Sequence, residues 1–273
     1  METPLRIDVD KVIEKKSPKA AKMVPCFVKN YLKRVIHQDE INQMLQLYGH
    51  LRGAECLRAV FSHLEITYSS SGLDTLDKNG RYLFASNHPF GGMDGMMLLD
   101  ELHRYFGDGK AIANDLLMNV VPLESLFIPI NKHGSQSRAT ASQMDQVLNS
   151  DIPVATFPAG LCSRCIDGRI VDLDWKPNFV KKALETRRDI VPVYFEGRLS
   201  NFFYRLSKIR KALGVKFNIE MLYLADELFA QRGGNFTIRF GTPIPHQQIA
   251  SMGTPREVTA KVREMVYQMA ENC

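Results

Sequence analysis

The stretch YLFASNHPFGGMDGMML, residues 82–98, contains the transition that decides the fold. Its first five residues are apolar or small, as in a strand that is buried on both faces of a parallel sheet. A histidine and two adjacent glycines follow, and from Asp94 onward apolar residues recur at helical spacing. A strand that leads through a short loop into a helix is the repeating unit of parallel α/β sheets. His88 would then lie at the carboxyl end of a strand, where open α/β sheets place their functional sites.

The same alternation of strands and helices continues along the chain. The apolar runs that predict strands are Tyr82–Ser86, Lys110–Asn114, Phe127–Ile130, Pro153–Phe157, Ile190–Phe195 and Phe236–Phe240. The segments with helical periodicity are Asp94–Phe106, Ser137–Ser150, Asn178–Arg187 and Phe202–Leu213. A last helix begins at the capping sequence Thr254–Glu257 and runs to Met269. We therefore predict an α/β fold with a largely parallel sheet that is flanked by helices.

The segment before this α/β unit is helical and basic. From Pro25 to Ile66, apolar residues recur every three or four positions, with polar and basic residues between them. Residues 1–36 hold nine Lys and Arg against four Asp and Glu, a net charge of +5. Such a segment is typical of contact with an anionic surface, and a solvated helix face is the alternative. We divide the chain into an N-terminal amphipathic helical extension, residues 1–70, and an α/β domain, residues 71–273.

Composition limits the class of protein further. The chain has 273 residues, 45% of them hydrophobic, which is enough to bury a substantial core. It shows no secretory signal and no run of about 20 apolar residues, so we predict a cytoplasmic protein, soluble or peripheral on a membrane. Five scattered cysteines favour reduced thiols, and the lone pair Cys162 and Cys165 predicts no metal site. The basic residues match no nucleic-acid motif, so we expect no nucleic-acid partner.

His88 and Asp94 are candidates for a catalytic pair. On a continuous helix their side chains would point about 240° apart, so they meet only if the intervening chain forms a loop. Pro89 and the adjacent glycines permit such a loop. The carboxylate would then fix the imidazole tautomer and leave the other ring nitrogen to act as a general base. The alternative is a loop histidine beside an aspartate that caps the next helix.

The sequence shows no evident protein nucleophile. A G-x-S-x-G elbow and a phosphate-binding P-loop are both missing from the chain. In the catalytic interpretation, His88 therefore deprotonates an acceptor hydroxyl or amine, which attacks the other substrate directly.

A second polar turn, FPAG at residues 157–160, follows another predicted strand. With Ser163 and Arg164 just beyond it, this turn combines backbone amides with a guanidinium, which suits a phosphate or a carboxylate. Arg164 can equally well pair with Asp167 or Asp172, and the turn alone does not decide between these possibilities.

Four sequence blocks together resemble those of the glycerolipid acyltransferase superfamily. The blocks occur in the family's order and at similar spacing: Asn87-His88-Pro89 with Asp94, Phe127–Lys132, Phe157–Gly160 with Ser163-Arg164, and Ile190–Val193. The similarity extends over roughly residues 70–244. It is strongest to the lysophospholipid acyltransferase type, in the bacterial branch described as hemolysin-like or aminolipid O-acyltransferase.

The resemblance implies transfer of a fatty acyl group from an acyl-carrier-protein or coenzyme A thioester to the hydroxyl of a lysolipid. The thioester would be a co-substrate, and no cofactor would be bound. The catalytic pair would be His88 and Asp94. The acceptor-binding residues would be Asn131, Lys132, Phe157, Pro158, Gly160, Ser163 and Arg164.

The lipid substrates also imply access from a bilayer. We therefore expect a peripheral protein on the inner face of the cytoplasmic membrane. The basic amphipathic stretch Phe202–Leu213 would take part in this contact together with the N-terminal segment. Burial of its apolar side against the sheet is the alternative.

Two departures from the family pattern bear on the acceptor. The family usually has four residues between the histidine and the aspartate, whereas this chain has five. Its third block is Phe-Pro-Glu-Gly-Thr-Arg-Ser, whereas Ala159, Leu161 and Cys162 replace Glu, Thr and Arg here, and an arginine follows only at Arg164. One displaced arginine suits a carboxylate at least as well as a phosphate. We therefore expect an N-acyl amino acid that bears a hydroxyl. The alternatives are lysophosphatidic acid, as in phospholipid synthesis, and a non-catalytic acyl-carrier- or lipid-binding protein of the same fold.

Overall fold

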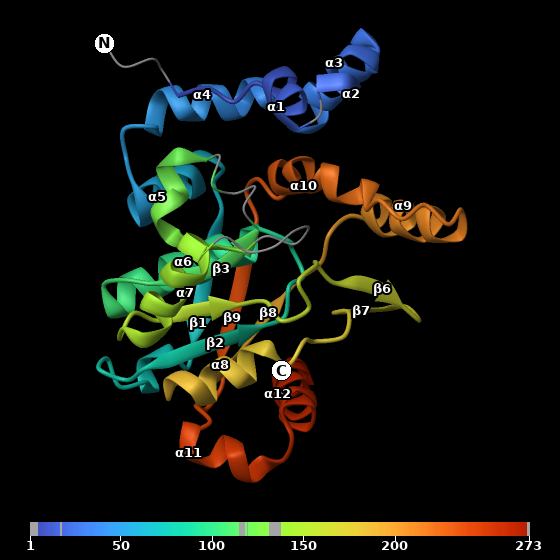
Figure 1. Ribbon diagram of the computed structural model, residues 1–273. Helices are drawn as coiled ribbons and strands as arrows, with labels where there is room; N and C mark the ends of the chain where they lie inside the picture. The colour runs from blue at the N-terminus through green and yellow to red at the C-terminus, as the bar shows by residue number, and fades with distance from the viewer. Residues whose placement is uncertain (1–4, 17, 115–117, 119, 131–137, 272–273) are drawn as a thin grey trace.

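A seven-stranded sheet lies at the centre of the computed structural model, which describes residues 5–16, 18–114, 118, 120–130 and 138–271 (Figure 1). From one edge to the other, its strands are β1 (Thr67–Ser71), β9 (Asn235–Phe240), β8 (Asp189–Glu196), β2 (Tyr82–Ser86), β5 (Val154–Thr156), β3 (Lys110–Asn114) and β4 (Phe127–Ile130). The strands from β8 to β4 are all parallel, β9 is antiparallel to β8, and β1 is parallel to β9. The predicted α/β fold with a largely parallel sheet is confirmed.

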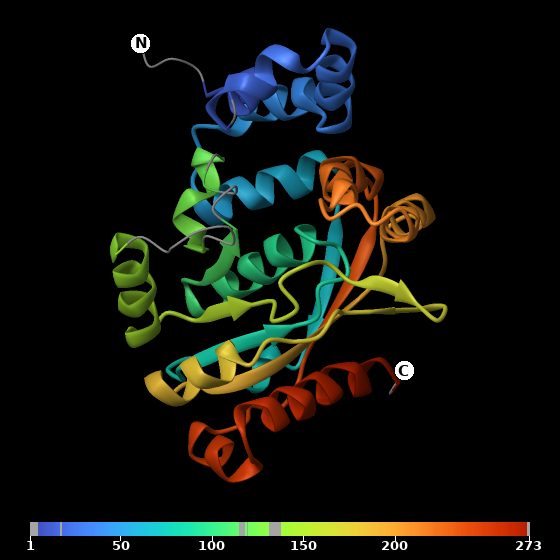
Figure 2. The same ribbon diagram turned by 45° about the vertical axis from the view of Figure 1, so that its right-hand side comes forward.

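Helices cover both faces of this sheet. The helices that pack on it are α5 (Gly53–His63), α6 (Met93–Phe106), α7 (Arg138–Asn149), α8 (Asn178–Thr186) and α12 (Pro255–Glu271). Side chains alternate along β2, so that Phe84 joins a core with α5 and α6, while Leu83 and Ala85 join a second core with α7, α8 and α12. Figure 2 shows α5 and α6 above the sheet and α8 and α12 below it. The result is a three-layer sandwich with two cores.

Four further helices form a layer above α5 at the top of Figure 1. They are α1 (Val9–Lys16), α2 (Pro18–Met23), α3 (Cys26–Val35) and α4 (Gln38–Tyr48), and they meet α10 (Leu224–Ala230). His37, between α3 and α4, stacks on Phe229 with ring centroids 4.3 Å apart, and its Nε2 lies 2.9 Å from Asp226 Oδ1. The Tyr31 hydroxyl lies 2.5 Å from that of Tyr223. These contacts attach the N-terminal layer to the body through α10 and Tyr223, the residue before it.

The structure places two elements differently from the division at residue 70. Helix α5 belongs to the α/β body, because Leu57 and Phe61 are buried in its core. The polar segment that follows is not part of the helical extension but forms β1 at the edge of the sheet. Most β1 side chains are exposed, so the segment lacks the apolar alternation that marks a strand.

The predicted elements otherwise lie close to their predicted bounds. Strands β2, β3 and β4 begin and end at the predicted residues, and α6, α7, α8 and α9 (Asn201–Ala212) agree within one residue at each end. The short elements of the body that were not predicted are β6 (Arg164–Ile166), β7 (Arg169–Val171), α10, α11 (His246–Ile249), and the 3-10 turns η1 (Leu73–Thr75), η3 (Val121–Leu126), η4 (Ile219–Tyr223) and η5 (Ala250–Met252). Strands β6 and β7 form a hairpin that projects from the body (Figure 2). None of the described helices is both long and apolar enough to cross a membrane.

Candidate active site

The candidate site lies at the carboxyl edge of β2 and β5. These strands are parallel neighbours, so the loop that follows Ser86 and the turn that follows Thr156 leave the sheet at the same edge. There the ring of Phe157 stacks on His88, with ring centroids 4.3 Å apart and an interplanar angle of 30°. Two blocks that are about 70 residues apart in sequence thus form one surface.

His88 and Asp94 are in contact, as the loop between them predicts. His88 Nδ1 lies 2.9 Å from Asp94 Oδ2, and the buried carboxylate also accepts hydrogen bonds from the backbone N–H groups of Phe90 and Gly95. Because an ionised carboxylate only accepts hydrogen bonds, Nδ1 must carry a hydrogen and the neutral ring keeps its lone pair on Nε2. The His88 side chain is 15% exposed, and no described residue hydrogen-bonds to Nε2. This arrangement suits a general base.

The extra residue between histidine and aspartate is accommodated by a turn at Gly91. Helix α6 begins at Met93, so the carboxylate of Asp94 lies in its first turn and points back toward the loop. Gly91 has a φ of +70°, and a Cβ there would lie 2.9 Å from Leu224 Cδ2 and 3.0 Å from Cys162 Cβ. Both the backbone conformation and the lack of space require glycine. The sequence offered two interpretations of Asp94, as the partner of His88 or as a residue at the start of the next helix. In the structure Asp94 occupies both positions at once.

The side chain of Asn87 anchors the loop to the sheet. Its Oδ1 accepts a hydrogen bond of 2.7 Å from the backbone N–H of Phe195, and its Nδ2 donates one of 2.9 Å to the carbonyl of the same residue. The amide thus imitates a strand neighbour and extends the pairing of β2 with β8 by one position. This anchor fixes the position of His88, the next residue, at the carboxyl edge of the sheet.

Asp172 fixes the backbone of the same loop, and nothing local in the sequence marks it. Its buried carboxylate accepts hydrogen bonds from the backbone N–H of His88 at 3.1 Å, from Ser163 Oγ at 2.5 Å and from Trp175 Nε1 at 2.8 Å. Burial raises the pKa of Asp172, while the three hydrogen bonds favour its ionised form. Asp172 joins the His88 loop to the chain that follows the β6–β7 hairpin.

Phe157, Pro158 and Gly160 lie in the predicted turn beside His88, but Ser163 and Arg164 do not face it as free groups. The Ser163 hydroxyl is buried on Asp172. The Arg164 side chain is 4% exposed, with Nη2 3.0 Å from Glu220 Oε1. In this structure neither side chain is free to contact an acceptor, and their predicted role in binding it stays a prediction. Arg164 pairs with neither of its predicted internal partners, because a carboxylate in η4 takes it instead.

Glu220 is the centre of a buried ionic cluster. It binds Arg164 of β6 and Arg210 of α9, whose Nε lies 2.7 Å from Glu220 Oε2. The cluster ties the hairpin, η4 and α9 together. Beside it, burial raises the pKa of the Cys162 thiol to about 11, so this cysteine is not a reactive nucleophile.

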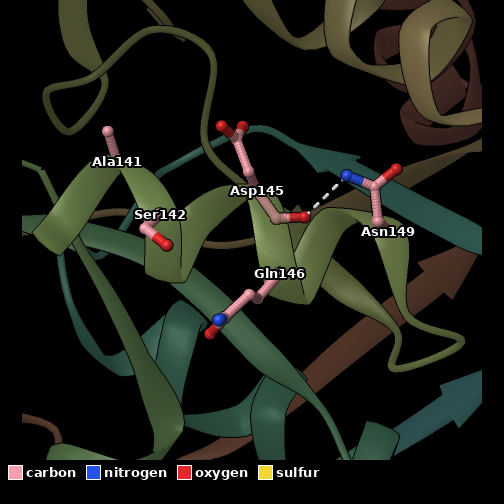
Figure 3. Close-up of a pocket in the computed structure, with 5 residues that line it drawn as sticks. All are labelled: Ala141, Ser142, Asp145, Gln146 and Asn149. Carbon is pink, nitrogen blue, oxygen red and sulfur yellow. Dashed lines mark hydrogen bonds between the residues drawn. The ribbon is translucent and has the colours of Figure 1, made fainter. Parts of the chain in front are cut away.

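The other acceptor-binding candidates, Asn131 and Lys132, lie outside the described residues. Within the described part of the chain, no group of three or more His, Cys, Asp and Glu side chains is arranged to hold a metal ion. Figure 3 shows a shallow depression on α7, lined by Ala141, Ser142, Asp145, Gln146 and Asn149. No hydrogen bond or ring contact among the described residues links it to His88, so we do not assign it to the site.

An imidazole backed by a buried carboxylate at the edge of a parallel sheet is an arrangement that can act as a general base. The family model described as Acyltransferase matches residues 11–273. Two proteins named lyso-glycine lipid O-acyltransferase, from Bacteroides thetaiotaomicron and Phocaeicola vulgatus, are each 46% identical to the chain over 264 residues. The matches cover 96% of this chain and 97% and 95% of theirs. The chain belongs to the acyltransferase family, which confirms the resemblance that the four blocks indicate.

Among solved structures, the chain is similar to the crystal structure of a 1-acyl-sn-glycerophosphate acyltransferase from Thermotoga maritima. The match covers 89% of this chain and 94% of the other, with 17% sequence identity and a TM-score of 0.49.

Proposed function

We propose that the protein transfers a fatty acyl group from an acyl-carrier-protein or coenzyme A thioester to the hydroxyl of a lysolipid, an N-acyl amino acid. The observation that carries this proposal is the 2.9 Å contact of His88 Nδ1 with the buried Asp94 carboxylate, which leaves Nε2 as the ring nitrogen that can accept a proton. The shared name of the two relatives, lyso-glycine lipid O-acyltransferase, supports the acceptor class.

The reaction proceeds in two steps through this imidazole. The acceptor hydroxyl gives its proton to His88 Nε2 as its oxygen attacks the thioester carbonyl carbon. Asp94 stabilises the imidazolium that forms. The tetrahedral intermediate then expels the thiolate as the carbon–sulfur bond breaks, and the thiolate takes the proton from His88. The products are an ester and a free thiol, and no acyl-enzyme is needed.

The surroundings of the third block favour a carboxylate over a phosphate monoester. Cys162, at the position of the family's arginine, is buried, and Arg164 is occupied by Glu220. A phosphate monoester carries about −1.5 to −2 charges and three acceptor oxygens, so it needs more donors than a carboxylate does. Because this turn has fewer available cations than the family's third block, it supports an acceptor whose head group is an amino acid.

A surface with exposed apolar and basic side chains supports a peripheral position on the inner face of the cytoplasmic membrane. Its apolar residues, which we call the apolar face, are Met23, Phe27, Tyr31, Phe202, Ile209, Leu213 and Phe217. Tyr223 links the part of this face on the N-terminal helices to the part on α9. Its hydroxyl hydrogen-bonds with that of Tyr31, and its ring packs edge-to-face on Phe202 with ring centroids 5.0 Å apart. The exposed basic residues near it in sequence include Lys22, Arg34, Arg205, Lys208, Lys211 and Lys216. Exposed apolar side chains that alternate in sequence with exposed cations are typical of helices that lie in a membrane interface.

The sequence of α9 allows either membrane contact or burial of its apolar side against the body, and the helix combines the two. Phe203 and Tyr204 are buried against the body, whereas Phe202, Ile209 and Leu213 belong to the apolar face. Arg210, which has the sequence position of a surface cation, is buried on Glu220 instead.

The experiment that tests the proposal is a kinetic comparison of acceptors. Purified protein receives the same acyl thioester, first on coenzyme A and then on an acyl carrier protein, with either a hydroxylated N-acyl glycine or lysophosphatidic acid. We expect a higher kcat/KM for the N-acyl glycine than for lysophosphatidic acid. The variant His88→Ala serves as the inactive control. A higher value for lysophosphatidic acid would assign the enzyme to phospholipid synthesis. Binding of lipid or thioester without turnover would make it a non-catalytic binding protein.

A further inference from the structure

The third block supplies no arginine to the surface beside His88. Cys162 is fully buried, and the Arg164 guanidinium is held by Glu220 and by the carbonyl of Cys162. If the acceptor is anionic, the cation that meets its charge must come from another part of the fold.

Lys176 brings an ammonium group to the same turn. Its backbone N–H donates a 3.1 Å hydrogen bond to the carbonyl of Pro158, and its Nζ lies 4.0 Å from the position that a Cβ would take on Gly160. Gly160 has a φ of +69°, a conformation that favours glycine, so the space on that side of the turn stays open. The ammonium is therefore adjacent to the backbone of the turn at 157–160. The first residue of this turn, Phe157, stacks on His88.

The Lys176 side chain is exposed and is not committed to a carboxylate in the described part of the chain. On the following helix, α8, Lys182 pairs with Asp145 and Glu185, whereas the ion pairs among the described residues do not include Lys176. An ammonium that lies against a turn without an anionic partner is available to a ligand.

The position of Lys176 is coupled to that of the candidate base. Asp172 accepts hydrogen bonds from the backbone N–H of His88 and from the indole of Trp175, the residue before Lys176. Trp175 is itself buried against Phe179 in the second core. One carboxylate thus fixes both the His88 loop and the segment that carries the ammonium, so their separation is set by the fold.

We infer that Lys176 binds the carboxylate of the acceptor while the acceptor's hydroxyl reaches His88. The inference rests on the proposed function and names the residue that selects its substrate. One ammonium with nearby loop amides balances the single charge of a carboxylate and leaves a phosphate monoester partly unpaired. Lys176 would then replace, from a different segment, the arginine that the third block lacks.

A matched pair of acceptors tests this role: a hydroxylated N-acyl glycine and its carboxamide, which has the same shape and no charge. In Lys176→Gln, we expect KM for the acid to rise about tenfold or more, because a hydrogen bond to a charged group contributes at least that much to affinity. The KM values for the carboxamide and the thioester should stay within about twofold. Lys176→Arg should retain most of the preference for the acid. Lys181→Gln, the same change at an exposed lysine of α8, is the control and should behave like the parent protein.

Two results would overturn the inference. A preference for the acid over the carboxamide that survives in Lys176→Gln would mean that another cation binds the head group. A rise in KM for the thioester would instead place Lys176 at the donor. Failure of the proposed function looks different, because the parent protein would then prefer lysophosphatidic acid or turn over neither acceptor.

Discussion

At Asp94, one buried carboxylate orients the imidazole and also closes the loop that carries it. Its Oδ2 binds both His88 Nδ1 and the backbone N–H of Phe90, and its Oδ1 binds the backbone N–H of Gly95. An amide in this place would keep the size of the side chain but would turn one acceptor into a donor. The imidazole would then lose the partner that keeps its lone pair on Nε2.

We therefore expect Asp94→Asn to lower kcat by about 10²–10⁴-fold, close to the loss in His88→Ala, since each change removes the positioned base. Steady-state kinetics checks this, with circular dichroism to verify that both variants are folded. Activity within threefold of the parent protein would reduce Asp94 to a residue that only starts α6.

The contact between His88 and Asp94 could be predicted because both residues lie within one strand, loop and helix. Asp172 and Lys176 could not, although they lie close to the same turn. The β6–β7 hairpin reverses the chain and returns these residues to the turn at 157–160. A contact made across a hairpin of three-residue strands leaves no periodic signal in the sequence.

At the scale of the elements, Arg188 joins the end of α7 to the central strands. Its fully buried guanidinium donates to five backbone carbonyls, those of Tyr82, Val147, Leu148, Ser150 and Ile152. Burial lowers the pKa of Arg188 to about 10, still well above neutral, so the group stays charged. Its sequence position, at the end of a helix and beside another arginine, is typical of a surface residue, and only the fold reveals its role.

Arg188→Met should lower the free energy of unfolding by roughly 2–4 kcal/mol, because it leaves several buried carbonyls without donors. Urea unfolding of the purified variants measures this loss. Arg187→Met changes the neighbouring arginine, whose side chain is exposed, and should change the free energy of unfolding by no more than about 0.5 kcal/mol. Equal effects of the two changes would contradict a special role for Arg188.

The sequence predicts the strands whose two faces are both buried by helices, but not the strand β1 at the edge of the sheet. β2 is buried at every position, and its apolar run has clear ends. β1 has the sequence TYSSS and pairs on one side only, so its neighbours do not require apolar side chains.

At the scale of the whole molecule, the N-terminal layer and α9 present the apolar face from two widely separated parts of the chain. Met23 and Phe27 are among its most exposed residues, at 81% and 73% exposure. The double variant Met23→Ser and Phe27→Ser should bind anionic vesicles at least tenfold more weakly, since inserting a large apolar side chain contributes about 1.5–3 kcal/mol. Vesicle sedimentation measures this loss.

Ile166→Ser, which alters an exposed apolar residue on the β6–β7 hairpin, is the control for this experiment and should bind like the parent protein. Unchanged binding by the double variant would assign membrane contact to α9 alone.

The edge strand β1 also constrains the order in which the protein assembles on the ribosome. Thr67 of β1 pairs with Asn235 of β9, about 170 residues later. At about 5–20 residues per second, β1 waits on the order of ten seconds or more for β9, its one neighbour among the described strands. A chain stalled before residue 235 leaves β1 and one side of β8 unpaired, and unpaired strand edges recruit other chains. Limited proteolysis should therefore cleave such nascent chains more readily than the released protein.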